Sequence, residues 1–557
     1  MSTPSATREA SSKPSKAPRA PGIRQTMSDV HTWTGLLVGW LLFAMFLTGT
    51  VSFFRDELSQ WMRPEVHAST GVDPADAANR VGDTLQRISP NSPVWYIGLP
   101  DARSNTAQVT WRGAKGFENG VFDPGTGERL EARATRGADF FYAFHFQFHY
   151  LPVIWGRILA GICAMFMLIA IVTGVIVHKK IFVDFFTFRW GKGQRSWLDA
   201  HNVLSVFGLP FHAMITYTGL ITLMALYVPW GMQAQYPTQA DRARFNAEFS
   251  PFMPLAKPAG EAAPLLPLAT FVRAAEQHWR DGQAGRIQVI NPGDTSARVL
   301  VARRDAQQIS NNPSYQIFNG VTGAVIRTVD GVRPAAETRG VLYGLHIGRF
   351  ADDTLRWLYF LCSLGGTAMV GTGLVMWTVK RRSKLPDPAR PHIGFRLVER
   401  LNIASIGGLT IAMTGMLWLN RLLPLGMAER AEWEINGFFI IWGVSLLHAI
   451  VRPAKRAWLE QLWAGVALLA LLPVFNMVAT SRGMIDSLRN DDWVFLGVDL
   501  MLLALAALLA EIARRTARHQ PRIKLARRTA AASTATPTPN TASASAAREP
   551  LMSEERR

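Results

Sequence analysis

Seven histidines lie in or at the ends of the first four long apolar segments of this chain: His31, His145, His149, His178, His201, His212 and His346. Two of them, His31 and His201, are each followed seventeen residues later by a Thr-Gly pair. An ionisable side chain is costly inside a bilayer, so its presence there indicates a function. Histidines at matched depth on several helices can bind a haem iron from both sides. The pattern therefore predicts a membrane haem protein that moves electrons.

Eight segments are apolar over about 18 residues or more, which is the length that a membrane-spanning helix needs. They cover residues 31–54, 155–178, 202–228, 355–379, 401–423, 435–452, 459–478 and 492–513. The first is too long for a signal-peptide core and lacks a convincing cleavage site, so we expect it to remain as an anchor. The predicted fold class is a polytopic α-helical membrane protein with about eight transmembrane helices and two small α+β domains.

The placement of the basic residues predicts the orientation of the chain. A formal net charge of +18 could suggest a nucleic-acid partner, but Lys and Arg crowd the two tails and the alternate connections 179–195, 380–396 and 452–456. Under the positive-inside rule these connections and both termini are cytoplasmic. We therefore expect a lipid bilayer and no nucleic acid as the partner of this charge. The composition of 529–550 is typical of a disordered tail.

Residues 31–180 and 201–380 repeat one unit: a span, a small soluble stretch and a second span. Thr173-Gly174 in the second span aligns with Thr372-Gly373 in the fourth. Both copies start from the cytoplasmic side, so they are parallel repeats. The spans within 401–513 lack this pattern and are predicted to form an appended helical bundle.

Each soluble stretch combines one helical pattern with several strand patterns. In the first, Asp73 and Pro74 are a helix start, followed by strand-like runs and a Thr-Gly turn at 126–127. The second repeats this order from Leu268 onward. The division predicted for the chain is a basic tail (1–28), a span (29–55), a small domain (56–140), a span (141–180), a loop (181–200), a span (201–229), a small domain (230–340), a span (341–380), a loop (381–398), a four-span bundle (399–514) and a tail (515–557).

Four motifs together make a resemblance specific enough to name a family. They are H-x-W-x-G-L followed by Thr-Gly, FHFQFHYLP followed by WGR, GVIVHKK, and SWLDAHNVLSVFGLPFHAMITYTG. Over about residues 25–385 the chain resembles the PepSY-associated transmembrane family of bacterial inner-membrane, iron-regulated proteins, which includes ferric-siderophore reductases. The resemblance implies PepSY domains in the periplasm, b-type haems in a four-helix core and reduction of chelated iron. The four additional C-terminal spans depart from the family's four-span pattern.

The internal symmetry suggests which histidines hold the two haems. Equivalent residues would pair, His31 with His201 near the cytoplasmic face and His149 with His346 near the periplasmic face. His145 lies one helical turn before His149, so both can face one way. His212 lies eleven residues after His201, about 16 Å further along the same face of an ideal helix, which suits two stacked haems.

A second set of pairings stays open because two histidines have no equivalent in the other copy. His178 aligns with Trp377 and His212 with Leu42, so His178 could pair with His201, and His212 with His149 or His346. Asp199, two residues before His201, could accept a hydrogen bond that fixes the imidazole tautomer.

The chain carries no phosphate-binding glycine motif for a flavin, a nicotinamide or a nucleotide, so we expect electrons from a membrane quinol or a separate reductase. A ferric chelate is the favoured acceptor, because reduction to softer Fe(II) weakens binding by hard oxygen donors. Two other functions stay open: a proton- or metal-coupled transporter, and a passive membrane anchor for PepSY binding modules. Basic and aromatic residues that could dock an anionic chelate, and that equally suit solvated strand faces, are Arg103, Trp111, Arg112, Lys115, Arg303 and Arg304.

Overall fold

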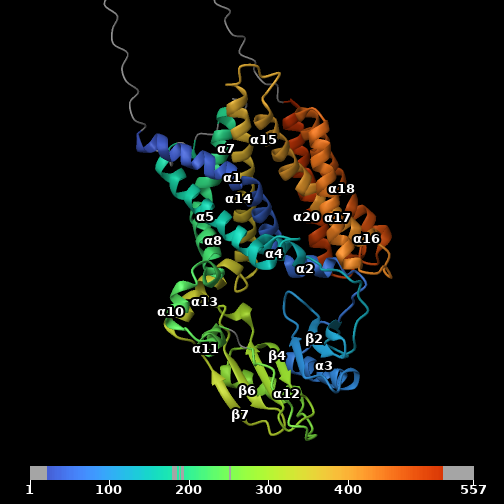
Figure 1. The fold of residues 1–557 in the computed structure, drawn as a ribbon. Helices are drawn as coiled ribbons and strands as arrows, with labels where there is room; N and C mark the ends of the chain where they lie inside the picture. Colours follow the sequence, from blue (N-terminus) through green and yellow to red (C-terminus); the bar gives the residue numbers. More distant parts are fainter. Residues whose placement is uncertain are drawn as a thin grey trace, which may run out of the picture. The chain divides into compact units, whose positions relative to one another are not determined.

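The computed structural model describes residues 22–178, 194–249 and 252–518, together with residues 183, 185, 186 and 189 (Figure 1). Within them, seven helices are long and apolar enough to cross a membrane, or eight if one bent pair counts as a single span. They are α1 (Ile23–Ser52), α5 (Val153–Val177), α14 (Asp353–Arg382), the continuous helix Ile393–Leu422, α17 (Arg430–Val451), α18 (Ala454–Ala479) and α20 (Trp493–Arg518), with α7 (Gln194–Phe207) and α8 (Leu209–Thr222) as the bent pair. The predicted class of polytopic helical membrane protein is confirmed.

The third predicted span is broken rather than straight. Its two halves, α7 and α8, meet at 68° around Gly208. Pro210 explains the break, because proline has no backbone N–H and its ring collides with the preceding turn of a helix. The expectation that His201 and His212 share one face of a straight helix is therefore wrong.

The duplicated part forms a core of long helices in which α1 packs against α5 and α14, and α14 packs against α7. A short helix precedes the second span of each copy: α4 (Asp139–Gln147) lies against α1, and α13 (Pro334–Ile347) lies against α8. The repeat is thus visible as long helix, sheet unit, short helix and long helix. Each of the two short helices carries a histidine into the core, His145 on α4 and His346 on α13.

The two α+β units that the sequence predicts are present, and their strands join into one antiparallel sheet in the order β3-β2-β1-β4-β5-β6-β7. The strands are β1 (Val94–Gly98), β2 (Ala107–Gly113), β3 (Gly116–Phe122), β4 (Ala284–Ile290), β5 (Arg298–Arg303), β6 (Tyr315–Asn319) and β7 (Val325–Val329). The copies meet where β1 pairs with β4, with Trp95 opposite Val289 and Ile97 opposite Ile287. Alternate residues of these strands pack under α3 (Pro74–Ile88) and α12 (Leu268–Trp279), which cover one face.

The helix cap predicted for the first copy is formed, but the predicted Thr-Gly hairpin forms only in the second copy. Asp73 caps α3 as predicted, and its carboxylate accepts from the N–H groups of Ala75 and Asp76. In the second copy the Thr-Gly turn joins β6 to β7, whereas in the first copy the chain after the turn makes only an isolated bridge, Phe122 with Arg129. The predicted last strand of the first copy is therefore not formed.

The C-terminal bundle comprises Ile393–Leu422, α17, α18 and α20. The first of these contains a π-helical segment, Ala404–Gly408, between α15 (Ile393–Ile403) and α16 (Leu409–Leu422). Asn402 ties the bundle to the core: it accepts from Trp40 Nε1 at 2.8 Å and donates to the Leu374 carbonyl at 2.9 Å. The remaining short helices are α2 (Arg55–Trp61), α9 (Met224–Tyr227), α10 (Trp230–Gln235), α11 (Gln239–Phe249), the 3-10 turn Asp305–Gln307 and α19 (Met484–Arg489).

Candidate functional site

Four Thr-Gly dipeptides, two in each copy, mark the places where a histidine from one helix meets the backbone of another. In every case the ring Nδ1 lies within hydrogen-bond distance of the carbonyl three residues before the threonine. The four contacts are His31 with the Ala170 carbonyl (2.8 Å), His201 with Met369 (2.9 Å), His145 with Met45 (2.6 Å) and His346 with Ile215 (2.9 Å). Each contact in one copy has its equivalent in the other.

These contacts decide the tautomer of each ring. A carbonyl oxygen can only accept, so Nδ1 must carry the proton. A neutral imidazole with a proton on Nδ1 has a free lone pair on Nε2, which is the state that a metal requires. Among the described residues, no hydrogen bond reaches Nε2 of any of the four histidines. Each helix contact therefore orients one ring and leaves one nitrogen available.

The glycine of each dipeptide supplies the space for the ring. A Cβ added to Gly174 or Gly373 would lie 3.2 Å from Cε1 of His31 or His201. The same atom at Gly49 or Gly219 would lie 2.8 Å from Cε1 of His145 or His346. Any larger residue would push the imidazole away, so Thr-Gly acts as a seat for a histidine from a neighbouring helix.

The four seated histidines form two pairs. The ring centres of His31 and His201 are 6.3 Å apart, and those of His145 and His346 are 6.2 Å apart. Metal–nitrogen bonds of about 2 Å on each side, plus roughly 1 Å from Nε2 to each ring centre, would place two trans imidazoles about 6 Å apart. Both pairs therefore have the separation that bis-histidine ligation of one iron needs. Fourteen residues separate His31 from Met45 on α1, so the pairs lie about 20 Å apart along that helix.

The pair formed by His145 and His346 lines a cavity that is partly open to solvent. Three arginines line the same cavity, Arg55, Arg103 and Arg349, with Asp56 among them. The positive charge exceeds the negative, and guanidinium groups bind carboxylates through paired hydrogen bonds. Protohaem carries two carboxylates, so these residues would supply imidazole nitrogens for its iron and cations for its carboxylates.

Arg103 comes from the loop between β1 and β2 and reaches back to the helices. It donates to the carbonyls of Arg349 and Ala351 at 2.8 and 2.7 Å. Burial, and then the nearby guanidinium groups of Arg356 and Arg349, lower the pKa of Arg103. Crowded cations of this kind favour an anionic ligand at the mouth of the cavity.

The expected pairing of His149 with His346 is wrong. Helix α4 ends at Gln147, and both Phe148 and Tyr150 have positive φ, so His149 leaves the face that carries His145. The His149 ring instead stacks on Phe439 of the C-terminal bundle at 5.5 Å. His145, one turn earlier, takes the position opposite His346.

The alternative pairings involve His178 and His212. His178 lies at the end of α5, and the ring beside His201 is that of His31. His212 is buried near the bend between α7 and α8, and its Nε2 lies 3.3 Å from the Cys362 carbonyl. Along the chain, His212 lies between His201, which belongs to one pair, and Ile215, whose carbonyl contacts His346 of the other pair.

Asp199 does not orient His201. Its carboxylate accepts from the backbone N–H and the guanidinium of Arg189, the closest contact being 2.7 Å, while the His201 ring contacts Met369. The expectation that Asp199 accepts a hydrogen bond from the His201 ring is therefore wrong. Among the residues that the structure describes, no group of three or more His, Cys, Asp or Glu side chains converges as a metal site of its own would require.

The six basic and aromatic residues suggested for chelate docking do not form one surface. Trp111 is buried in the core under the helices, Arg103 faces the helical cavity, and Arg304 donates to Pro100 and Gln283. The sequence argument also missed Arg55 and Arg349, which line the cavity around His145 and His346. Their signal was weak because arginines near a span end are ordinary interfacial residues.

Two comparisons place the chain among known proteins. Over 378 residues it is 27% identical to the uncharacterized protein PA4219 of Pseudomonas aeruginosa, a match that covers 64% of this chain and 89% of that protein. Residues 28–380, which contain all four seated histidines and the whole sheet, match the family described as the PepSY-associated TM region. Since this match covers more than half of the chain, the protein belongs to the PepSY-associated transmembrane family.

Proposed function

We propose that the protein is a b-type dihaem oxidoreductase of the bacterial inner membrane that passes electrons across the bilayer to a periplasmic ferric chelate. The observation that carries this proposal is the pair of matched histidine sites, with ring centres 6.3 and 6.2 Å apart and every Nε2 left open. The two sites lie at different depths of one helical core, as a path across a membrane requires.

The chain's own residues have separable tasks in this function. His31 and His201 would hold the inner haem, and His145 and His346 the outer one, each ring fixed by a carbonyl of a neighbouring helix. Second-shell hydrogen bonds of this kind orient a ligand and raise its basicity. A haem bound between two imidazoles supplies one-electron chemistry by cycling its iron between two oxidation states. Arg55, Arg103 and Arg349 would neutralise carboxylates at the outer site.

The orientation and the partners complete the proposal. The basic connections favour an orientation with both termini in the cytoplasm and the sheet in the periplasm. Electrons would come from a quinol or a separate reductase, because the sequence shows no flavin or nicotinamide motif. The ferric chelate would be a siderophore complex or another complex with hard oxygen donors. The affinity of such a chelator for iron falls when Fe(III) is reduced to Fe(II).

The first experiment is a reduced-minus-oxidised absorbance spectrum of the full-length protein, purified in detergent after expression with ample haem, with haem quantified per chain. We expect b-type bands and about two haems per chain. His145→Ala should retain one haem, because it removes one of the two outer ligands. His149→Ala is the matched control, a histidine four positions away that should retain both.

A colourless wild-type protein would overturn the proposal and favour transport or periplasmic binding. Loss of a haem in His149→Ala but not in His145→Ala would keep the dihaem function and reject our assignment of the outer ligand. Reduction of a ferric chelate by the loaded protein in proteoliposomes then tests the acceptor.

A further inference from the structure

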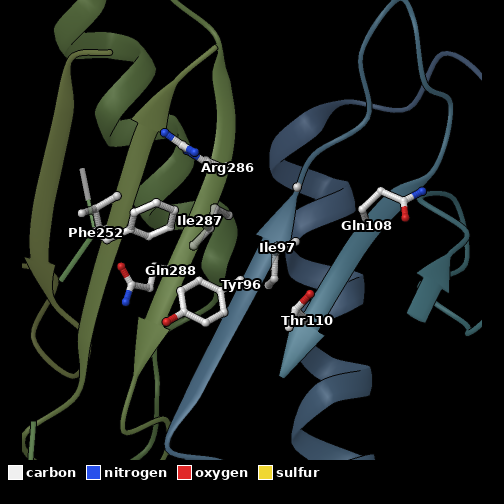
Figure 2. A pocket seen from close by; sticks show the side chains of 10 residues that line it. Tyr96, Ile97, Gln108, Thr110, Phe252, Arg286, Ile287 and Gln288 are labelled. Carbon is white, nitrogen blue, oxygen red and sulfur yellow. The ribbon is translucent and has the colours of Figure 1, made fainter. Parts of the chain in front are cut away.

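A second cavity lies on the sheet, and none of its lining residues belongs to the helices that carry the four seated histidines. It occupies the face opposite α3 and α12, over the junction of β1 with β4, and has a volume of about 520 Å³. Its floor is built from both copies, with Tyr96 opposite Gln288 and Gly98 opposite Arg286 in the register of the two strands. Figure 2 shows Tyr96, Phe252, Gln288 and Arg286 gathered on one side and Thr110 and Gln108 on the neighbouring strand.

One wall of this cavity is not part of the repeat. In the second copy, the connection between α8 and α12 contributes Phe252 to this wall, and Met253 follows it in the chain. Gln288 fixes this segment, because its amide accepts from the Met253 N–H and donates to the Met253 carbonyl, both at 2.8 Å. Met253 then packs on Leu300 and its neighbours and covers the second copy's side of the face.

The first copy's side of the same face stays open. The connection that precedes α3 runs elsewhere, since the Ser69 N–H donates to Asp123 at the turn after β3. Phe117 on β3 is 57% exposed, and its ring lies 6.4 Å from that of Tyr96. The cavity therefore lies where the covering segment ends, between an aromatic wall and a bare strand surface.

The chemistry of the lining combines aromatic rings with one cation. The ring of Phe252 lies 6.0 Å from that of Tyr96 in an edge-to-face arrangement, and the Arg286 guanidinium lies 5.1 Å over Phe252. A cation–π contact consumes no N–H donor. No carboxylate within the described part of the chain pairs with Arg286. The N–H donors of its planar guanidinium group are therefore available to an anion that lies beside the aromatic rings.

We propose that this cavity binds an anionic metal chelate built on aromatic rings, of the catecholate class, with Arg286 contacting the negative oxygens and Tyr96 and Phe252 contacting the rings. This inference deepens the proposed function and rests on it for the identity of the metal, since a ferric chelate is the proposed electron acceptor. The site would capture the chelate on the sheet rather than serve as the place of electron transfer.

The test uses the full-length protein in detergent and the gallium(III) complex of 2,3-dihydroxybenzoate. Gallium(III) is not reduced under these conditions, so calorimetric titration measures binding separately from electron transfer. We expect saturable binding that Arg286→Gln weakens about tenfold or more, because a charge-assisted contact is lost. Phe252→Ala should weaken it several-fold by removing a ring surface.

Arg112→Gln is the matched control. Arg112 is an exposed arginine on β2 whose side chain alternates with Trp111 and so lies on the same open face, outside the cavity lining. We expect it to bind as the wild type does, within about twofold. Equal weakening by Arg112→Gln and Arg286→Gln would mean general attraction by charge and would overturn the site. Arg286→Lys keeps the positive charge but loses the paired N–H donors of the guanidinium group. An affinity between those of the wild type and Arg286→Gln would support direct contact. This variant also serves if Arg286→Gln folds poorly.

Two further outcomes separate this inference from the proposed function. Absence of binding to a protein that carries two haems would overturn the cavity as a chelate site and leave the oxidoreductase standing. Binding to a colourless protein would support the cavity and remove the redox function. Tighter binding of gallium(III) citrate than of the aromatic complex would overturn the catecholate class.

Discussion

The duplicated core and the C-terminal bundle both hold histidines among apolar helices, yet they use the two ring nitrogens differently. In the core, His201 contacts a carbonyl through Nδ1 and keeps Nε2 open beside His31. In the bundle, His448 uses both: Nε2 lies 2.8 Å from Glu460, and Nδ1 lies 3.3 Å from the Gln461 amide. A histidine with both nitrogens occupied stabilises a structure, whereas one with an open Nε2 can bind a metal. The contrast locates the proposed chemistry in the core.

The charged side chains of the two regions differ in the same way as their histidines: those of the bundle are paired with one another, and those of the core line a cavity. In the bundle, Arg430 and Glu434 are fully buried and form an ion pair of 2.6 Å, and Glu434 also accepts from Thr135 and Asn420. These contacts pair the two buried charges and connect the bundle to residues between β3 and α4. Around His145, Arg55 and Arg349 share the single carboxylate of Asp56 at 3.6 and 3.4 Å, so the three arginines that line the cavity outnumber its carboxylates. One region is closed by its own contacts, and the other is built around space for a ligand.

The largest effect should come from removing a core ligand. We expect His201→Ala to retain one haem per chain and to lose electron transfer across the membrane, because the inner and outer sites act in series. Haem quantification and ferric-chelate reduction in proteoliposomes with an enclosed reductant measure the two results. His448→Ala, the bundle histidine, should keep both haems; if it loses one while His201→Ala keeps both, the contrast between the regions is wrong.

A smaller effect of a different kind should come from the bundle's ion pair. Glu434→Gln leaves the Arg430 charge buried without its partner, and breaking a buried pair costs about 3–5 kcal/mol. We expect a lower Tm in detergent, measured by intrinsic fluorescence, with the haem content per folded chain unchanged. The double replacement of Arg430 and Glu434 by methionine should recover much of the lost stability, because no unpaired charge remains. Loss of haem from folded Glu434→Gln protein would show that the two regions are not separable.

Sequence reasoning reached the number of spans and the duplication because these depend on long apolar runs and on repeated spacing. It could not choose between His145 and His149. Thr173 and Thr372 set an offset of 199 residues between the copies, which places His346 on Gln147, midway between the two histidines. The positive φ of Phe148 decides the matter, and a backbone conformation at a non-glycine residue leaves little trace in the sequence.

Two further features depend on contacts between distant segments. The junction of β1 with β4 joins strands almost 200 residues apart, and each strand alone reads as the edge of its own small sheet. Asp199 lies two residues before His201 in the chain, yet its carboxylate accepts from Arg189. The Thr-Gly pairs were visible as a repeat, but their role as seats for histidines required the neighbouring helix to be in place.

The smallest and most discriminating change compares a glycine of the core with one of the bundle. A Cβ at Gly219 would lie 2.8 Å from Cε1 of His346, and a Cβ at Gly465 would lie 2.8 Å from a terminal methyl of Leu509. Both Gly→Ala changes gain the same helix propensity, about 1 kcal/mol, so their backbone effects cancel in the comparison. Leucine can rotate away, whereas the seated imidazole must tilt, which would alter its bond to the iron of the proposed haem. We expect Gly219→Ala to shift the midpoint potential of one haem by on the order of 40 mV, which corresponds to about 1 kcal/mol for one electron. Gly465→Ala should leave both potentials unchanged in the same redox titration, and equal shifts in the two variants would show that the core glycines have no special relation to the histidines they face.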